Sequence, residues 1–228
     1  MEAAYVAWHG LCQALKPYGQ AARLFNAGWL ALALGAGAAV AGEQPLRLVA
    51  FGDSLTAGYR LQASAAFPAQ LERALAAQGR RVVVINAGVS GDTTARGLAR
   101  LDWTLGERPD AVILELGAND ALRGVKPAVT YANLDRILTR LGARGVPVLL
   151  AGMLAPPNLG RRYGKRFNAV FPRLVEKHGV PLYPFFLAGV ATNRALKLRD
   201  GMHPNRAGVA VMVARIMPYV LRLLDGVR

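Results

Sequence analysis

The stretch L-R-L-V-A-F-G-D-S-L, residues 46–55, decides the fold. Residues 46–51 form a short apolar run that ends at Gly52, which is typical of a buried strand. Two further runs end at a glycine in the same way, V-V-V-I-N-A at 82–87 and A-V-I-L-E-L at 111–116. Apolar runs at 146–154 and 180–183 complete a set of five predicted strands.

Helical patterns separate these strands. They predict helices at 66–78, 130–144, 163–178 and 205–224, and one more from a cap at Thr93 or Thr94 through Leu101. Pro172 should kink or split the helix at 163–178, and Pro218 should bend or interrupt the last one. Strands that alternate with helices form a parallel sheet covered on both faces. The sequence therefore predicts a doubly wound α/β fold, a three-layer α/β/α sandwich.

The composition limits the kinds of function. With 228 residues, of which 53% are hydrophobic and 18% charged, the chain can form one packed domain with a short extension. One cysteine excludes an internal disulfide, and no Cys or His pair has zinc-ligand spacing, so no metal or other cofactor is expected. The net charge of +14 can attract anionic lipid, but the arginines are scattered, so no nucleic-acid partner is expected.

The first 42 residues differ from the remainder. Residues 27–40 are apolar and uncharged, too short to span a bilayer comfortably, but similar to the core of a secretory signal. Lys16 and Arg23 precede this core, and the small residues 39–41 form a cleavage site before Gly42. We expect a signal or anchor at 1–42, one folded domain at 43–228, and a periplasmic or secreted protein. The 26 residues before the core are long for a signal, so the true start lies downstream of Met1 or the segment stays as a membrane anchor; the alternative is a buried N-terminal helix.

Polar residues follow the predicted strands, where doubly wound folds place their ligand sites. They are Ser54 after the first strand, Gly91 after the second, Asn119 after the third, and Asp200 and His203 before the last helix. Each alone also suits a turn or a helix cap. Together they supply what acyl transfer needs: a hydroxyl, a base, a group that orients the base, and donors for an oxyanion. Only His203 among the histidines follows an acidic residue by one turn, so Asp200 can fix its tautomer.

Four blocks in this order resemble the GDSL or SGNH hydrolases: G-D-S-L at 52–55, S-G-D-T at 90–93, G-A-N-D at 117–120 and D-G-M-H-P-N at 200–205. The resemblance is closest to the bacterial thioesterase I, lysophospholipase or arylesterase group and runs from about residue 46 to the C-terminus. It implies a flavodoxin-like SGNH fold and a Ser54, His203 and Asp200 triad. It also implies an oxyanion hole formed by the Ser54 and Gly91 N–H groups and the Asn119 amide, with Gly88 as the weaker alternative to Gly91.

The same resemblance sets expectations for the substrate. Leu154, Ala155 and Pro156 lie in the expected substrate loop, and Ala155 stands where the family often has leucine, which can alter the acyl-chain preference. Ala118 replaces the usual second glycine beside Asn119. The expected activity is hydrolysis of small-molecule esters and thioesters by a monomer. The alternatives are a carbohydrate O-acetylesterase and a non-catalytic lipid-binding module.

Overall fold

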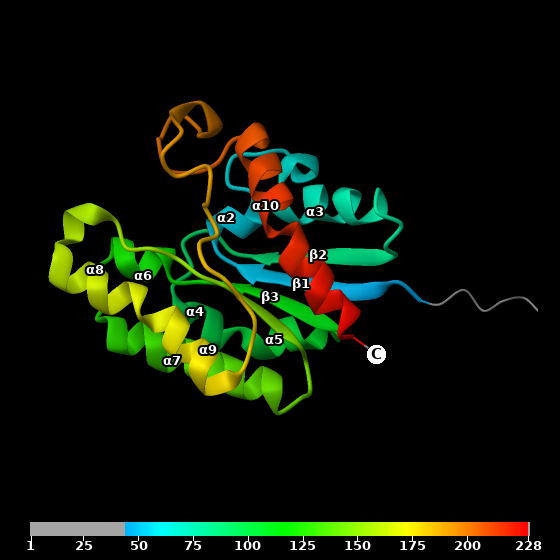
Figure 1. The fold of residues 1–228 in the computed structure, drawn as a ribbon, viewed down its shortest axis with the longest axis horizontal. Coiled ribbons are helices and arrows are strands. Elements are labelled where there is room, and N and C mark those ends of the chain that lie inside the picture. Colours follow the sequence, from blue (N-terminus) through cyan, green and yellow to red (C-terminus); the bar gives the residue numbers. More distant parts are fainter. Residues whose placement is uncertain (1–43, 228) are drawn as a thin grey trace, which may run out of the picture. The chain divides into compact units, whose positions relative to one another are not determined.

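A computed structural model describes residues 44–227, which form a five-stranded parallel sheet between two layers of helices (Figure 1). The strand order is β2-β1-β3-β4-β5, and every neighbouring pair is parallel. This order is that of the flavodoxin-like folds, so the predicted fold class is confirmed. The strands are β1 (Leu46–Gly52), β2 (Val82–Gly88), β3 (Ala111–Glu115), β4 (Val148–Ala151) and β5 (Leu182–Tyr183).

Helices α3 and α10 cover one face of the sheet, and α4, α5, α7 and α9 cover the other (Figure 1). The most apolar part of α10 is half buried in this domain, which accounts for a composition that would also suit a membrane span. The α-helices are α2 (Ser54–Ala57), α3 (Phe67–Ala76), α4 (Thr94–Ala99), α5 (Leu101–Gly106), α6 (Ala118–Leu122), α7 (Pro127–Gly142), α8 (Arg161–Asn168), α9 (Val170–His178) and α10 (Arg206–Asp225). Three short 3-10 helices are η1 (Ala63–Ala65), η2 (Pro157–Leu159) and η3 (Arg194–Leu196).

Several predicted boundaries were wrong. The helix expected at 163–178 is two helices that meet at Ala169, and Pro172 lies in the first turn of α9, where a missing N–H breaks no helical bond. The helix α10 runs uninterrupted through Pro218. Thr93 caps α4, but the chain forms a second helix, α5, that the pattern did not predict. The signal-like segment 1–42 lies outside the described residues.

The sheet brings the ends of β1, β2 and β3 together. The strand β3 is buried along its whole length, and the last five residues of β1 are buried as well. The chain leaves β1 toward one neighbour and β3 toward the other, so the two strands flank the point at which the strand order reverses. Doubly wound folds form their ligand clefts at this point. Ser54 follows β1 and Asn119 follows β3, so both reach the cleft from adjacent strands.

Candidate active site

Ser54 is the first residue of α2, at the sharp turn that follows β1. The turn is tight because Gly52 has no side chain: a Cβ there would lie 2.5 Å from the Glu115 Oε2 atom. Asp53 caps α2 by accepting the Leu55 N–H at 3.0 Å. The Ser54 N–H, at the helix start, donates to no other residue of the described range, and Ser54 lines a cavity beyond the strand ends.

A chain of hydrogen bonds joins Ser54 to His203 and Asp200. The His203 Nε2 atom lies 3.0 Å from the Ser54 Oγ, and its Nδ1 atom lies 2.9 Å from the Asp200 Oδ2. Because an ionised carboxylate can only accept, the proton of neutral His203 sits on Nδ1, which leaves the Nε2 lone pair directed at the serine hydroxyl. The structure thus brings together three residues that lie up to 149 positions apart in the sequence.

Asp200 is held as an anion by its own turn. Partial burial raises its pKa, but hydrogen bonds from the Met202 N–H, the His203 side chain and the His203 N–H outweigh this effect and lower the pKa to about 2. The Asp200 Oδ1 accepts both N–H groups, so Oδ2 is left for the imidazole. On its other side the His203 ring packs on Tyr59, with ring centroids 4.4 Å apart. These contacts hold the imidazole in one orientation.

The glycine after β2 that presents a free N–H is Gly91, not Gly88. Gly88 donates its N–H to the Asn86 Oδ1 at 3.0 Å, whereas the Gly91 N–H has no acceptor among the described residues. Gly91 also has a φ of 84°, a conformation that L side chains rarely adopt. The Arg123 side chain donates to the Gly91 carbonyl at 3.0 Å and so fixes this peptide. Gly91 lines the same cavity as Ser54.

The Asn119 side chain is oriented by a buried carboxylate. Its Nδ2 atom donates to the Asp53 Oδ2 at 2.9 Å, while Asn119 itself lines the cavity. An amide nitrogen carries two hydrogens, so the second remains for a ligand. Asp53 thus both caps α2 and orients Asn119.

Glu115 lies beneath this arrangement, fully buried at the end of β3. Its Oε2 atom accepts the Asp53 N–H at 3.2 Å and the Thr56 hydroxyl at 2.8 Å. Burial and the nearby charge of Asp53 raise the pKa of Glu115 well above its ordinary value, and burial raises the pKa of Asp53 to about 6. The sequence analysis missed Glu115, although a charged residue within the apolar run A-V-I-L-E-L was a signal that could have revealed it.

Replacing Glu115 by glutamine should change how stability depends on pH. A carboxyl with a raised pKa binds its proton more tightly in the folded state, so wild type loses stability as pH rises above the ordinary value of 4.5. Glutamine keeps an acceptor for Asp53 and Thr56 but does not titrate. The free energy of unfolding is measured by urea denaturation. The value for Glu115→Gln minus the value for wild type should therefore increase from about pH 5 to about pH 8. The partly exposed Glu107→Gln is the control, and a Glu115→Gln advantage that shrinks with pH would contradict the prediction.

The cavity beside Ser54 has a volume of about 780 Å³, large enough for a small organic ligand. Leu154, Ala155 and Pro156, the residues of the expected substrate loop, all line it. Most of the remaining wall is also apolar, contributed by residues that include Leu55, Met153, Phe185 and Leu187. The polar groups in the wall include those around Ser54. A ligand with an apolar chain and one polar end would therefore place its polar end beside the Ser54 hydroxyl. Within residues 44–227, no group of His, Cys, Asp or Glu is arranged to hold a metal ion.

Known proteins with similar sequences are hydrolases. Residues 50–211 match the model of the GDSL-like lipase/acylhydrolase family. The chain is 42% identical to an arylesterase of Vibrio mimicus over 70% of this chain and 80% of that protein. It is 44% identical to thioesterase 1/protease 1/lysophospholipase L1 of Escherichia coli strain K12, over 70% of this chain and 76% of that protein.

A solved structure shows the same architecture. The crystal structure of AlinE4, an SGNH-hydrolase family esterase, is 45% identical, with a TM-score of 0.68 over 80% of this chain and 98% of that one. These relatives are hydrolases, which favours an enzyme over the non-catalytic lipid-binding module. The chain therefore belongs to the GDSL-like lipase/acylhydrolase family and is a carboxylic ester hydrolase with the SGNH-hydrolase fold.

Proposed function

We propose that Ser54 is the nucleophile in a two-step hydrolysis of carboxylic esters and thioesters, with His203 as the base and Asp200 as the residue that orients it. The observation that supports this most is the continuous hydrogen-bonded chain from Asp200 through His203 to Ser54 in the wall of an apolar cavity. The Ser, His and Asp arrangement is the one that activates a serine hydroxyl in unrelated hydrolases.

In the first step the Ser54 Oγ bonds to the carbonyl carbon while its proton passes to the His203 Nε2. The imidazolium, paired with Asp200, then gives this proton to the alcohol or thiol that leaves as the C–O or C–S bond breaks. In the second step water attacks the acyl-enzyme ester, and His203 takes a proton from that water. The carboxylic acid departs as the proton returns to the Ser54 Oγ.

We assign the oxyanion site to the Ser54 N–H, the Gly91 N–H and the second hydrogen of the Asn119 amide. Both backbone N–H groups lack acceptors in the described part of the chain, and Asp53 holds the Asn119 amide. Donors fixed in this way stabilise the charge that develops in the tetrahedral intermediate without reorganising.

Asn119→Ala is expected to lower kcat by about 10²- to 10³-fold with little change in KM, because the lost bond strengthens only as the oxyanion forms. Steady-state kinetics with p-nitrophenyl butyrate measure both constants. Asn158→Ala, in the exposed turn η2, is the matched control and should keep wild-type kinetics. If kcat of Asn119→Ala were unchanged, the assignment of Asn119 to the oxyanion site would be wrong.

The substrates that we propose are aryl esters, acyl thioesters and lysophospholipids, the classes named in the curated relatives. The apolar cavity supports an acyl chain longer than acetyl. In a series of p-nitrophenyl esters, kcat/KM should rise about threefold for each added methylene until the chain outgrows the cavity. A parallel panel of acyl-CoA, lysophospholipid and acetylated sugar tests the alternative, because greatest activity on the acetylated sugar would identify an O-acetylesterase and contradict this proposal.

We further propose that the enzyme is exported, with residues 1–42 as a signal or an anchor. The uncharged core at 27–40 and the small residues at 39–41 support this. Sequencing the N-terminus of protein recovered from the cell envelope is the test. A start near Gly42 is expected, and a start at Met1 would contradict cleavage.

A further inference from the structure

Apolar side chains are exposed around the mouth of the cavity. Seven large hydrophobic side chains are exposed in the described range, and four of them lie at this opening. Leu122, Leu154 and Met202 line the cavity, and Val89 directly precedes its lining residue Ser90. They come from four separate segments, so one continuous apolar stretch of sequence does not explain their gathering. Exposed apolar groups collected around one opening are typical of an interaction surface.

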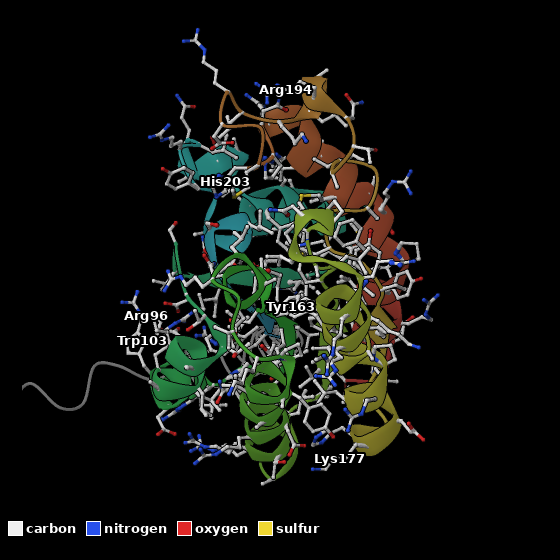
Figure 2. All side chains as sticks on the ribbon, turned by 90° about the vertical axis from the view of Figure 1, so that its left-hand side faces the viewer. Arg96, Trp103, Tyr163, Lys177, Arg194 and His203 are labelled. Atoms are coloured by element: carbon white, nitrogen blue, oxygen red, sulfur yellow. The ribbon has the colours of Figure 1, made fainter. Side chains whose placement is uncertain are left out.

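Cationic side chains surround the same opening. Figure 2 looks onto this end of the molecule and shows Arg194 beside the His203 region, with Lys177 toward the opposite edge. Several exposed cations lie within five residues of a residue that lines the cavity. Among them are those that we call the rim cations: Arg60, Arg123, Lys126, Arg161, Arg162 and Arg194. None of them forms an ion pair with a carboxylate within residues 44–227.

Some cations elsewhere on the surface are paired with carboxylates. The exposed and half-buried pairs lie at the amino ends of strands or along the helices: Arg47–Glu107, Arg80–Asp225, Arg140–Asp102 and Lys177–Asp135. At the cavity, Asp53 is buried and Asp200 is engaged by His203. Other exposed cations, such as Arg81 and Arg108, also lack an ion pair in the described residues, but the rim cations are those that lie near the opening of the cavity, together with the exposed apolar side chains.

Two rim cations occupy positions that are unfavourable for their own helix. Arg161 and Arg162 open α8, and no acidic residue or side-chain cap is present in that first turn. The helix dipole disfavours positive charge at an amino end, so these arginines do not stabilise α8. Tyr163 ties the same turn to the loop after α6 by donating to the Val125 carbonyl at 2.8 Å. This bond fixes the start of α8 beside the loop that follows α6, and the charge of the two arginines there does not contribute to the stability of the helix.

We propose that this rim docks on an anionic phospholipid surface. The four apolar side chains enter the headgroup layer, and the rim cations bind lipid phosphates. Basic residues mixed with exposed aliphatic groups favour a lipid surface, whereas a nucleic-acid partner would use the cations and leave the aliphatic groups without a role. Docking places the cavity mouth against the membrane, so an acyl chain passes from the lipid into the cavity. The inference rests on the proposed function, because hydrolysis at Ser54 is what would follow once the acyl chain has entered the cavity.

The test uses occlusion of the active site as its readout. Hydrolysis of soluble p-nitrophenyl acetate by the full chain is measured with increasing amounts of ether-linked vesicles, which contain no cleavable ester. Vesicles that include ether-linked phosphatidylglycerol should inhibit, and vesicles of ether-linked phosphatidylcholine alone should not. Binding through residues 1–42 alone would not depend on the rim cations. Absence of inhibition by the anionic vesicles would overturn the proposal.

Matched variants locate the surface. Arg161→Glu/Arg162→Glu should raise the lipid concentration for half-inhibition by about 30-fold or more, because each basic residue near an anionic surface contributes about a factor of five. Arg81→Glu/Arg108→Glu makes the same charge change in the loops before β2 and β3 and should behave as wild type. Equal effects of the two double variants would show that net charge alone acts and would overturn the rim assignment.

A second pair tests the apolar part. Val89 and Val83 are similarly exposed, at 42% and 39%, but Val83 lies on β2 away from the mouth. Val89→Ser should weaken inhibition a few-fold, and Val83→Ser should not. Both double variants and both valine variants should hydrolyse p-nitrophenyl acetate normally without vesicles. A variant that hydrolyses normally but is no longer inhibited by vesicles has therefore lost docking alone. Failure of wild type to hydrolyse the ester would instead contradict the proposed function.

Discussion

Replacing Ser54 by alanine should lower kcat for p-nitrophenyl esters by about 10⁴- to 10⁶-fold. The reason is that the Ser54 Oγ is the hydroxyl which the His203 Nε2 contacts, at 3.0 Å, so no other group can form the acyl-enzyme. The residual rate comes from the oxyanion donors and from binding, which the variant keeps. Initial rates across a range of enzyme concentrations provide the measurement, and labelling with a fluorophosphonate probe should disappear with the activity.

The control for this prediction is Ser64→Ala, which removes an exposed hydroxyl. It should retain both activity and labelling. Thermal unfolding of Ser54→Ala should resemble that of wild type, because the side chain is small and its only hydrogen bond in the described structure is to His203. Hydrolysis that survives at the wild-type rate in folded Ser54→Ala would exclude Ser54 as the nucleophile.

His203→Gln should cause a loss of similar size, about 10⁴- to 10⁶-fold in kcat. Glutamine can still bond to Asp200, but it cannot take the Ser54 proton near neutral pH, so the hydroxyl remains a weak nucleophile. Fluorophosphonate labelling should slow in parallel with hydrolysis, because both need the activated oxygen. Comparing the two rates separates loss of nucleophile activation from loss of substrate binding.

The molecule contains a matched control for this histidine. The His178 Nε2 atom lies 2.7 Å from the Asp135 Oδ1, so it also pairs with a carboxylate, but among the described residues no serine contacts it. His178→Gln should therefore keep wild-type kinetics. If His203→Gln retained substantial activity, or if His178→Gln lost it, the assignment of the base would be wrong.

The strands were predictable because their environment is simple. The last five residues of β1 and all of β3 are buried, and they are apolar except for Gly52 and Glu115, so these runs are visible without a structure. The helix boundaries were less predictable. Apolar spacing continues from α8 into α9, so the pattern does not reveal that the chain breaks at Ala169, three residues before Pro172. The 3-10 helices leave no periodic pattern to detect.

The residues of the site could be named because their chemistry depends on residue type. A hydroxyl, an imidazole one turn after a carboxylate, and an amide at a strand end are visible in the sequence. The contacts that support these residues were not visible. Tyr59 packs on His203, Glu115 lies beneath Asp53, and these contacts join segments distant in the chain.

The sequence alone determined the alternation of strands and helices, the parallel sheet and the residues that follow each strand, because burial and turn chemistry are local properties of the chain. The tertiary structure decided which of these residues meet. It shows that the N–H of Gly91 is free among the described residues whereas that of Gly88 is bonded, and that His203, not His178, reaches a serine. It also gathered exposed cations and apolar side chains around Ser54. Distances between separate segments are set by the packing of the whole sheet, and no local pattern in the sequence contains them.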